Sequence, residues 1–151
     1  MSFLTLAQAK AHLRIDDSSG DTDLTIKIAA AERSAVEYLS CNVYADQTAL
    51  DTAIAAVPAS LVTAKTTYDA SYATAIAMTD IDLSLIEQAQ AMSVYMRAVY
   101  GATRTRYGIV INDLILSAML LIVGYLNEVR EDGEALPRAA QDLLNPFRCY
   151  A

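Results

Sequence analysis

The sequence has no tryptophan, one histidine, two cysteines, three prolines and five glycines in 151 residues. Proline and glycine interrupt helices most strongly, so their scarcity predicts long, regular elements. His12 is the only histidine, and no nucleophile or phosphate-binding motif accompanies it. With Cys41 and Cys149 it makes three widely spaced metal ligands, whereas a zinc site needs about four. The sequence therefore predicts no enzyme, no metal site and no cofactor.

Positive charge is also scarce, with 11 Lys and Arg against 18 Asp and Glu and a formal net charge of −7. Binding nucleic-acid phosphates requires clustered Lys and Arg, and few basic residues lie close together except Arg104 and Arg106. A general DNA-binding role is therefore disfavoured. An acidic surface that DNA passes without sticking agrees with this charge.

Long hydrophobic runs are missing as well. The most apolar run, residues 114–126, spans 13 residues, whereas a membrane-spanning helix needs about 20. The opening MSFLTLAQAKAHL lacks the basic start and apolar core of a secretory signal. We therefore expect a soluble protein made in the cytoplasm, with no membrane contact and with two free thiols rather than a disulfide.

What the sequence does contain is apolar residues at helical spacing. Thr5 and Gln8 have the spacing of a capping box, which predicts a short helix over residues 6–13. Residues 23–41 form an amphipathic helical pattern that begins after a turn-rich loop, with Asp21 or Thr22 as its cap. A strongly apolar helix over residues 114–129, capped by Asn112 or Asp113, is the expected central element.

Residues 42–108 are harder to assign. The segment 42–78 is rich in Ala and Thr, and Pro58 is expected to divide it into two helical arms that project as a hairpin. A partly disordered loop is the alternative. A helix over residues 79–101, starting at Thr79 or Asp80, has an apolar face through Leu83, Ile86, Ala89, Met92 or Ser93, and Met96. The following residues, 102–108, are expected to be a loop.

The end of the chain, LLIVGYLNEVREDGEALPRAAQDLLNPFR, has several termination signals. Glu128, Glu131, Asp132 and Glu134 form an acidic exit from the central helix, with Gly133 as its terminator. Pro137 begins a short helix through Leu144 that Pro146 ends. Leu136, Ala140 and Leu143 or Leu144 are expected to dock this helix on the core.

These elements predict an all-α fold. It is a small helical bundle with a projecting Ala-rich helical hairpin and at most one short strand or extended segment, at residues 109–111. We expect one domain, with a core over residues 1–41 and 79–151 and an insertion over residues 42–78.

Two groups of polar residues invite a functional interpretation. Asp16, Asp17, Asp21 and Asp23 flank an SSG turn, but their spacing does not match a calcium loop, and helix capping explains them better. Arg104, Arg106 and Tyr107 form a basic and aromatic group, for which a contact to an acidic neighbouring subunit is favoured over a contact to nucleic acid.

The two ends of the chain resemble the head–tail connector proteins of tailed phages and prophages. The resemblance covers residues 1–41 and 114–148, with the insertion as the departure from the family. It rests on Leu6, Ala9, Lys10, His12 and Leu13, on Asp21, Asp23 and Leu24, and on Leu126, Arg130, Glu131, Leu136, Pro137, Leu143, Leu144, Pro146, Phe147 and Arg148.

The resemblance implies a structural virion protein without catalytic residues, located at the head–tail junction. Such a subunit forms a ring with copies of itself below the portal protein, extends the channel for passing DNA, and contacts the next head-completion or tail protein. Phe147 and Arg148 would be presented to a neighbour. A small nucleic-acid-binding packaging subunit of the terminase kind, and a small-molecule-binding or catalytic helical bundle, are the alternatives.

Overall fold

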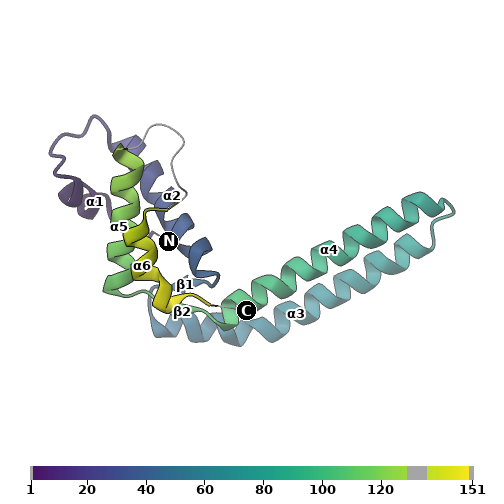
Figure 1. The fold of residues 1–151 in the computed structure, drawn as a ribbon. Helices are drawn as coiled ribbons and strands as arrows, with labels where there is room; N and C mark the ends of the chain where they lie inside the picture. Colours follow the sequence, from purple (N-terminus) through teal and green to yellow (C-terminus); the bar gives the residue numbers. More distant parts are fainter. Residues whose placement is uncertain (1, 129–135, 150–151) are drawn as a thin grey trace. The chain divides into compact units, whose positions relative to one another are not determined.

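The computed structural model describes residues 2–128 and 136–149. Its contacts divide the chain into two compact units, of which the first combines residues 1–47 with 109–151 and the second comprises residues 48–108. The described part contains six α-helices and a pair of two-residue strands, which confirms the predicted all-α class (Figure 1). The single-domain organisation stays a prediction.

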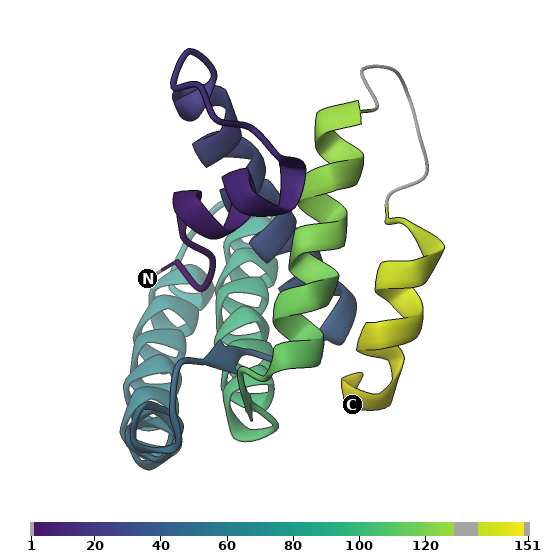
Figure 2. The ribbon, with the colours of Figure 1, turned by 90° about the vertical axis from the view of Figure 1, so that its left-hand side faces the viewer.

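The first unit is built around α5 (Asp113–Glu128). Three other helices pack against α5, namely α1 (Leu6–Leu13), α2 (Asp21–Leu39) and α6 (Arg138–Leu144) (Figure 2). The buried side of α5 consists of Ile115, Ala118, Met119, Ile122 and Val123, none of them more than 1% exposed. The predicted central apolar helix is thus confirmed.

Local signals in the sequence define several helix ends. The Thr5 hydroxyl accepts a hydrogen bond from the backbone N–H of Gln8 at 3.2 Å, and the Gln8 side chain accepts one from the Thr5 N–H at 2.9 Å. The predicted capping box is therefore confirmed. The Asn112 side chain likewise accepts from the N–H of Ile115 at 3.0 Å, at the start of α5.

The start of α2 differs from the prediction. Its N-cap is Gly20, which offers no side-chain hydrogen bond, and Asp21 is already the first helical residue. Asp21 still stabilises this end, because a carboxylate in the first turn interacts favourably with the helix dipole. It also pairs with Lys10 of α1 at 2.7 Å, which joins the first two helices.

A small parallel sheet replaces the single extended segment that the sequence predicted. Strand β1 (Val43–Tyr44) pairs with β2 (Ile109–Val110), with Val43 opposite Ile109. The Ile109 N–H donates to the Asn42 carbonyl at 2.9 Å, and the Ile111 N–H donates to the Tyr44 carbonyl at 2.8 Å. The pairing therefore places the segment that precedes residues 48–108 beside the segment that follows them.

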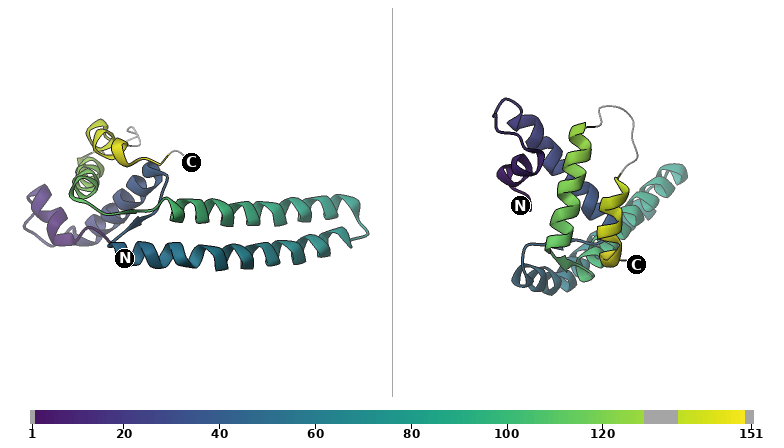
Figure 3. Two further views of the ribbon diagram at one scale, coloured as in Figure 1. Left: turned by 90° about the horizontal axis from the view of Figure 1, so that it is seen from below. Right: turned by 60° about the vertical axis from the view of Figure 1, so that its left-hand side comes forward.

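The second unit consists of α3 (Gln47–Ile76) and α4 (Ile81–Arg106), two antiparallel helices that form a hairpin (Figure 3). The expectation that Pro58 divides residues 42–78 into two arms is wrong, because α3 continues through it for 30 residues. The partner of α3 in the hairpin is α4, which the sequence had assigned to the core. An interior proline removes one backbone hydrogen bond, but the rest of a long helix with a helical partner can outweigh that local loss.

The end of α4 also lies beyond the predicted position. Gly101 is inside the helix, and the expected loop 102–108 is helical as far as Arg106. Glycine costs about 1 kcal/mol relative to alanine inside a helix, which does not suffice to end it. Arginines in the last turn also interact favourably with the helix dipole. The start of α4 agrees with the prediction, since the Asp80 side chain accepts from the N–H of Leu83 at 3.0 Å.

The C-terminal helix docks as predicted. Leu136, Ala140 and Leu144 are buried in the core of the first unit, and Leu143 packs partly buried against it. Pro146 lies in a 3₁₀ turn (Asn145–Phe147) directly after α6. The predicted acidic exit and the terminator Gly133 lie outside the described residues, apart from Glu128.

Glu32 of α2 fixes the N-terminal segment. One of its carboxylate oxygens accepts hydrogen bonds from the Ser2 hydroxyl at 2.8 Å and from the backbone N–H groups of Phe3 at 2.6 Å and Leu4 at 2.7 Å. The adjoining Leu4 side chain is buried in the core. An ionised acceptor strengthens such bonds relative to a neutral one.

Replacing Pro58 by alanine is expected to stabilise the protein by about 1–3 kcal/mol, because alanine restores a helical hydrogen bond and removes a steric clash. Urea denaturation followed by circular dichroism measures the change. The neighbouring exposed position supplies the matched control, since Ala59→Pro should destabilise by a similar amount. An unchanged or lower urea midpoint for Pro58→Ala would show that Pro58 does not destabilise α3.

Glu32→Gln is expected to lower the free energy of unfolding by about 1–3 kcal/mol, because the amide keeps the shape of the side chain but loses the charge that strengthens three hydrogen bonds. Guanidinium denaturation provides the measurement. Asp142→Asn, an exposed acid-to-amide change in α6, is the control and should stay within about 0.5 kcal/mol of the wild type. Equal effects of the two changes would contradict the anchoring role.

Candidate functional site

Phe147 and Arg148 lie at the C-terminal end of the first unit, beside the end of α2. The Arg148 guanidinium lies over the Tyr38 ring, with 5.0 Å between its central carbon and the ring centroid. The Tyr38 hydroxyl donates to the Asn145 side chain at 2.6 Å. The N–H of Cys149 donates to the Leu39 carbonyl at 2.9 Å. These contacts hold the C-terminal segment against the end of α2.

The two predicted residues of this surface differ in exposure. Phe147 is half-buried and packs against the core, so its ring mainly stabilises the first unit. Arg148 is exposed, and its position over an aromatic ring still leaves it accessible to a neighbouring molecule. Arg148 together with Tyr38 is therefore the accessible part of this candidate surface.

Arg104, Arg106 and Tyr107 belong to the second unit, at the C-terminal end of α4. Arg104 is half-buried, and its guanidinium lies 5.9 Å from the centroid of the Tyr100 ring. Arg106 is exposed, and Tyr107, the C-cap residue, is 58% exposed. This group is the basic and aromatic surface that the sequence predicted, carried by a helix end instead of a loop. Arg148 belongs to the other unit.

The acidic residues around the SSG turn have structural partners. Asp21 pairs with Lys10 at 2.7 Å and Asp23 with Lys27 at 2.7 Å. Asp17 accepts hydrogen bonds from the hydroxyl and the N–H of Ser19, and these bonds lower the pKa of its carboxyl group. Within residues 2–128 and 136–149, no group of three or more His, Cys, Asp or Glu side chains is placed to hold a metal ion.

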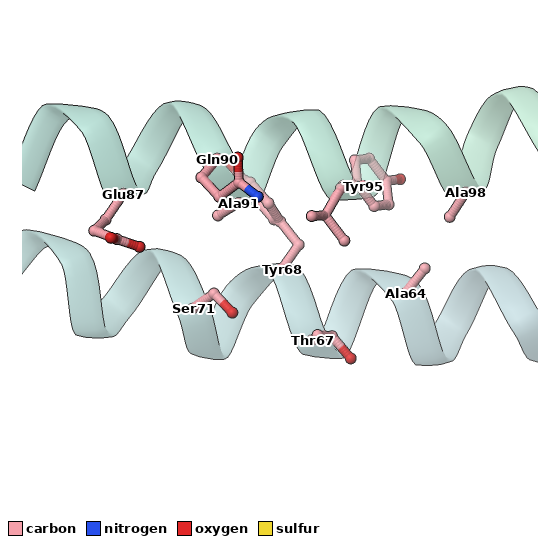
Figure 4. A pocket seen from close by; sticks show the side chains of 10 residues that line it. Ala64, Thr67, Tyr68, Ser71, Glu87, Gln90, Ala91, Tyr95 and Ala98 are labelled. Carbon is pink, nitrogen blue, oxygen red and sulfur yellow. The ribbon is translucent and has the colours of Figure 1, made fainter.

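A narrow groove runs between α3 and α4 (Figure 4). Small side chains such as Ala64, Ser71 and Ala91 line part of it, and the rings of Tyr68 and Tyr95 approach each other with 5.4 Å between their centroids. Its volume is about 240 Å³. Small-molecule pockets usually measure about 300–1,000 Å³, so the groove is better explained as the gap that small residues leave between two helices.

The apolar face predicted for α4 is not the face that α4 buries. Leu83, Ile86 and Met96 are all exposed, whereas Ser84 and Ala91 are buried. Ala91 and the rings of Tyr68 and Tyr95 lie between α3 and α4, whereas the large apolar side chains of α4 are left exposed. Among the exposed residues we define an apolar stripe as Ile81, Leu85, Met92 and Met96, of which the predicted face included Met92 and Met96 but not Ile81 and Leu85. Their spacing of four, seven and four residues was the signal available in the sequence.

The family model for phage gp6-like head-tail connector proteins matches residues 3–90, more than half of the chain. The chain belongs to this family. No curated protein matches the chain, and no solved structure does either.

The match to the connector family covers the N-terminal part of the chain. It includes α1, α2 with Glu32, the whole of α3 and the first turns of α4. It therefore extends into the segment that the sequence treated as a departure from the family. The C-terminal part of the resemblance, residues 114–148, lies outside the matched range.

Membership of this family makes the protein a structural phage protein of the head–tail junction. Among the residues that the structure describes, no helix combines the length and the apolar character needed to cross a membrane. The surfaces described above are thus the candidates for contacts between this connector subunit and other virion proteins.

The contacts around Tyr38 predict a small and measurable contribution to stability. Tyr38→Phe should lower the free energy of unfolding by about 1 kcal/mol through loss of the hydrogen bond to Asn145. Arg148→Ala should lower it by about 0.5–1 kcal/mol through loss of the cation–π contact. Urea denaturation checks both. Arg138→Ala, at an exposed position of α6, is the control, and a larger effect there would argue against this docking.

Proposed function

We propose that the protein is a head–tail connector subunit that assembles as a ring below the portal after genome packaging. The ring extends the channel for DNA and offers a surface to the next head-completion or tail protein. The observation that carries this proposal is the family match over residues 3–90. That match supports the connector role, and ring formation is the finer part of the proposal that can be measured directly.

The charge of the chain supports a role as a channel for DNA. With a net charge of −7, the protein repels phosphates on average, which favours passage of DNA over binding to it. Sequence-specific recognition would need several basic side chains directed at base edges. The basic residues at the end of α4 are instead suited to an acidic surface of another subunit.

A ring is a head-to-tail assembly, in which one surface of each copy meets a different surface of the next copy. We place one surface at Arg104, Arg106 and Tyr107, where two arginines adjoin an exposed aromatic ring. Arg148 over Tyr38 is the second candidate, for a neighbouring subunit or a partner protein. Arginine and tyrosine are both enriched in protein interfaces, which supports these two choices.

The ring is tested by light scattering behind size exclusion at several protein concentrations, with negative-stain images of any large species. The same measurement is repeated with the portal protein of the same phage, since the portal can act as the template for assembly. Closed rings, alone or on the portal, are the expected result. Absence of rings under both conditions would contradict the proposal.

Reversing the charge of the basic surface is expected to weaken ring assembly. Arg104→Glu/Arg106→Glu should raise the concentration needed for rings about tenfold or more, because like charges then oppose each other across the contact. Circular dichroism verifies the fold, and Arg106→Glu alone tests the exposed arginine. Lys65→Glu, elsewhere on the same hairpin, is the control. Unchanged assembly of both arginine variants would remove this surface from the ring contact.

A further inference from the structure

The hairpin leaves its largest apolar side chains in contact with water. The apolar stripe on α4 is 75% exposed at Ile81, 60% at Leu85, 45% at Met92 and 54% at Met96. In contrast, the buried residues of α4 are the small Ser84 and Ala91. Exposed apolar side chains that follow one side of a helix mark a contact surface for another helix.

The stripe has the geometry of a second helix contact. At about 100° per residue, its centre lies about a quarter turn from the side of α4 that faces α3 through Ser84 and Ala91. One helix can therefore occupy each side, as in an antiparallel four-helix bundle. The 26 residues of α4 give a length of about 39 Å for such a contact.

The order of the residues along the stripe favours an antiparallel copy of α4 as the occupant. If a two-fold axis passes between Gln88 and Ala89, Ile81 lies level with Met96 of the other copy. Leu85 lies level with Met92 of the other copy in the same arrangement. All four exposed residues are then opposite one another, and the contact uses the same surface on both copies.

Two charged residues make this orientation specific. Asp82 follows the first residue of the stripe and Arg97 follows the last, and both lie on the same flank of α4. Asp82 lies about 70° from the centre of the stripe and Arg97 about 130°, so Arg97 reaches the contact through its long side chain. Both are exposed, and neither forms an ion pair with any residue that the structure describes. In the antiparallel arrangement, Asp82 of each copy lies within about two residues, or about 3 Å along the axis, of Arg97 of the other copy. A parallel arrangement does not bring these opposite charges together.

We propose that two free copies of this protein pair through α4, antiparallel, with the apolar stripe at the centre and Asp82 beside Arg97 at each end. In a ring of more than two copies, neighbours are related by a rotation of less than 180° about one axis, so their α4 helices keep one direction relative to that axis and cannot be antiparallel. The antiparallel pair is therefore a contact of the free protein, distinct from the ring contact, and it does not depend on the ring being formed.

Sedimentation equilibrium of the full chain between about 1 and 100 μM, a range spanning typical weak and moderate affinities, is the first test. A dimer is expected. Leu85→Ser/Met92→Ser should weaken dimerisation about tenfold or more, because it removes apolar area from the contact. Leu83→Ser/Ile86→Ser changes two exposed apolar residues of α4 outside the stripe and should leave it unchanged. A wild-type monomer at every concentration would overturn the proposal.

Charge exchange tests the orientation. Asp82→Arg and Arg97→Asp should each weaken the dimer about tenfold, since each places like charges together, whereas the double variant Asp82→Arg/Arg97→Asp should recover wild-type affinity. The double variant should not pair with the wild-type chain, because both ends of that mixed dimer would be repulsive. Failure of the double variant to recover would contradict the antiparallel contact.

Cysteine cross-linking locates the two-fold axis. In a Cys41→Ala/Cys149→Ala background, Gln88→Cys lies next to the axis and should form a disulfide-linked dimer on oxidation. Ile81→Cys should not, since two copies of this position lie about 22 Å apart, but a mixture of Ile81→Cys with Met96→Cys should cross-link. Cross-linking of Ile81→Cys alone would show a parallel contact and overturn the proposal.

The pairing and the connector function can fail independently. Rings that form without the Gln88→Cys cross-link would overturn the pairing and leave the connector function unaffected. Cross-linked dimers that form no ring on the portal would contradict the ring and leave the pairing unaffected.

Discussion

The burial of α5 is the interaction on which the first unit depends. Its five buried residues contact helices from both ends of the sequence, α1 and α2 before the hairpin and α6 after it. The core therefore forms only when segments separated by residues 48–108 come together. The pairing of β1 with β2 supports this closure, because it joins the chain just before the hairpin begins to the chain just after it ends.

The helices of the hairpin pack differently from the helices of the first unit. Small residues such as Ala64 and Ala91 lie between the two helices of the hairpin together with the rings of Tyr68 and Tyr95, and few of its apolar side chains are buried. Much of its large apolar surface remains exposed, including the stripe on α4. A helical element of this kind is well suited to contacts with another chain, because burial of these side chains is still available as a driving force for assembly.

In this head–tail connector, the two units present their surface residues in different ways. The first unit fixes its own ends, through Glu32 at the N-terminal segment and through Tyr38 at the C-terminal segment. Rigid ends present their surface residues in one orientation, which lowers the entropy cost of binding a partner. In the pairing that we propose, the order of apolar and charged residues along α4 distinguishes an antiparallel neighbour from a parallel one.

The sequence by itself determined the elements that depend on neighbouring residues. The capping box of Thr5 and Gln8 and the cap at Asn112 involve residues three apart, and the central apolar helix and the docking of Leu144 follow from periodicity alone. Only the tertiary structure decided that α3 continues through Pro58, because packing along a long hairpin outweighs a local loss of one hydrogen bond. It also decided which side of α4 turns inward, with Ser84 and Ala91 buried, because that choice depends on a second helix and not on α4 alone. The position of Arg148 on Tyr38 joins residues far apart in the chain, and no local pattern encodes a contact of that kind.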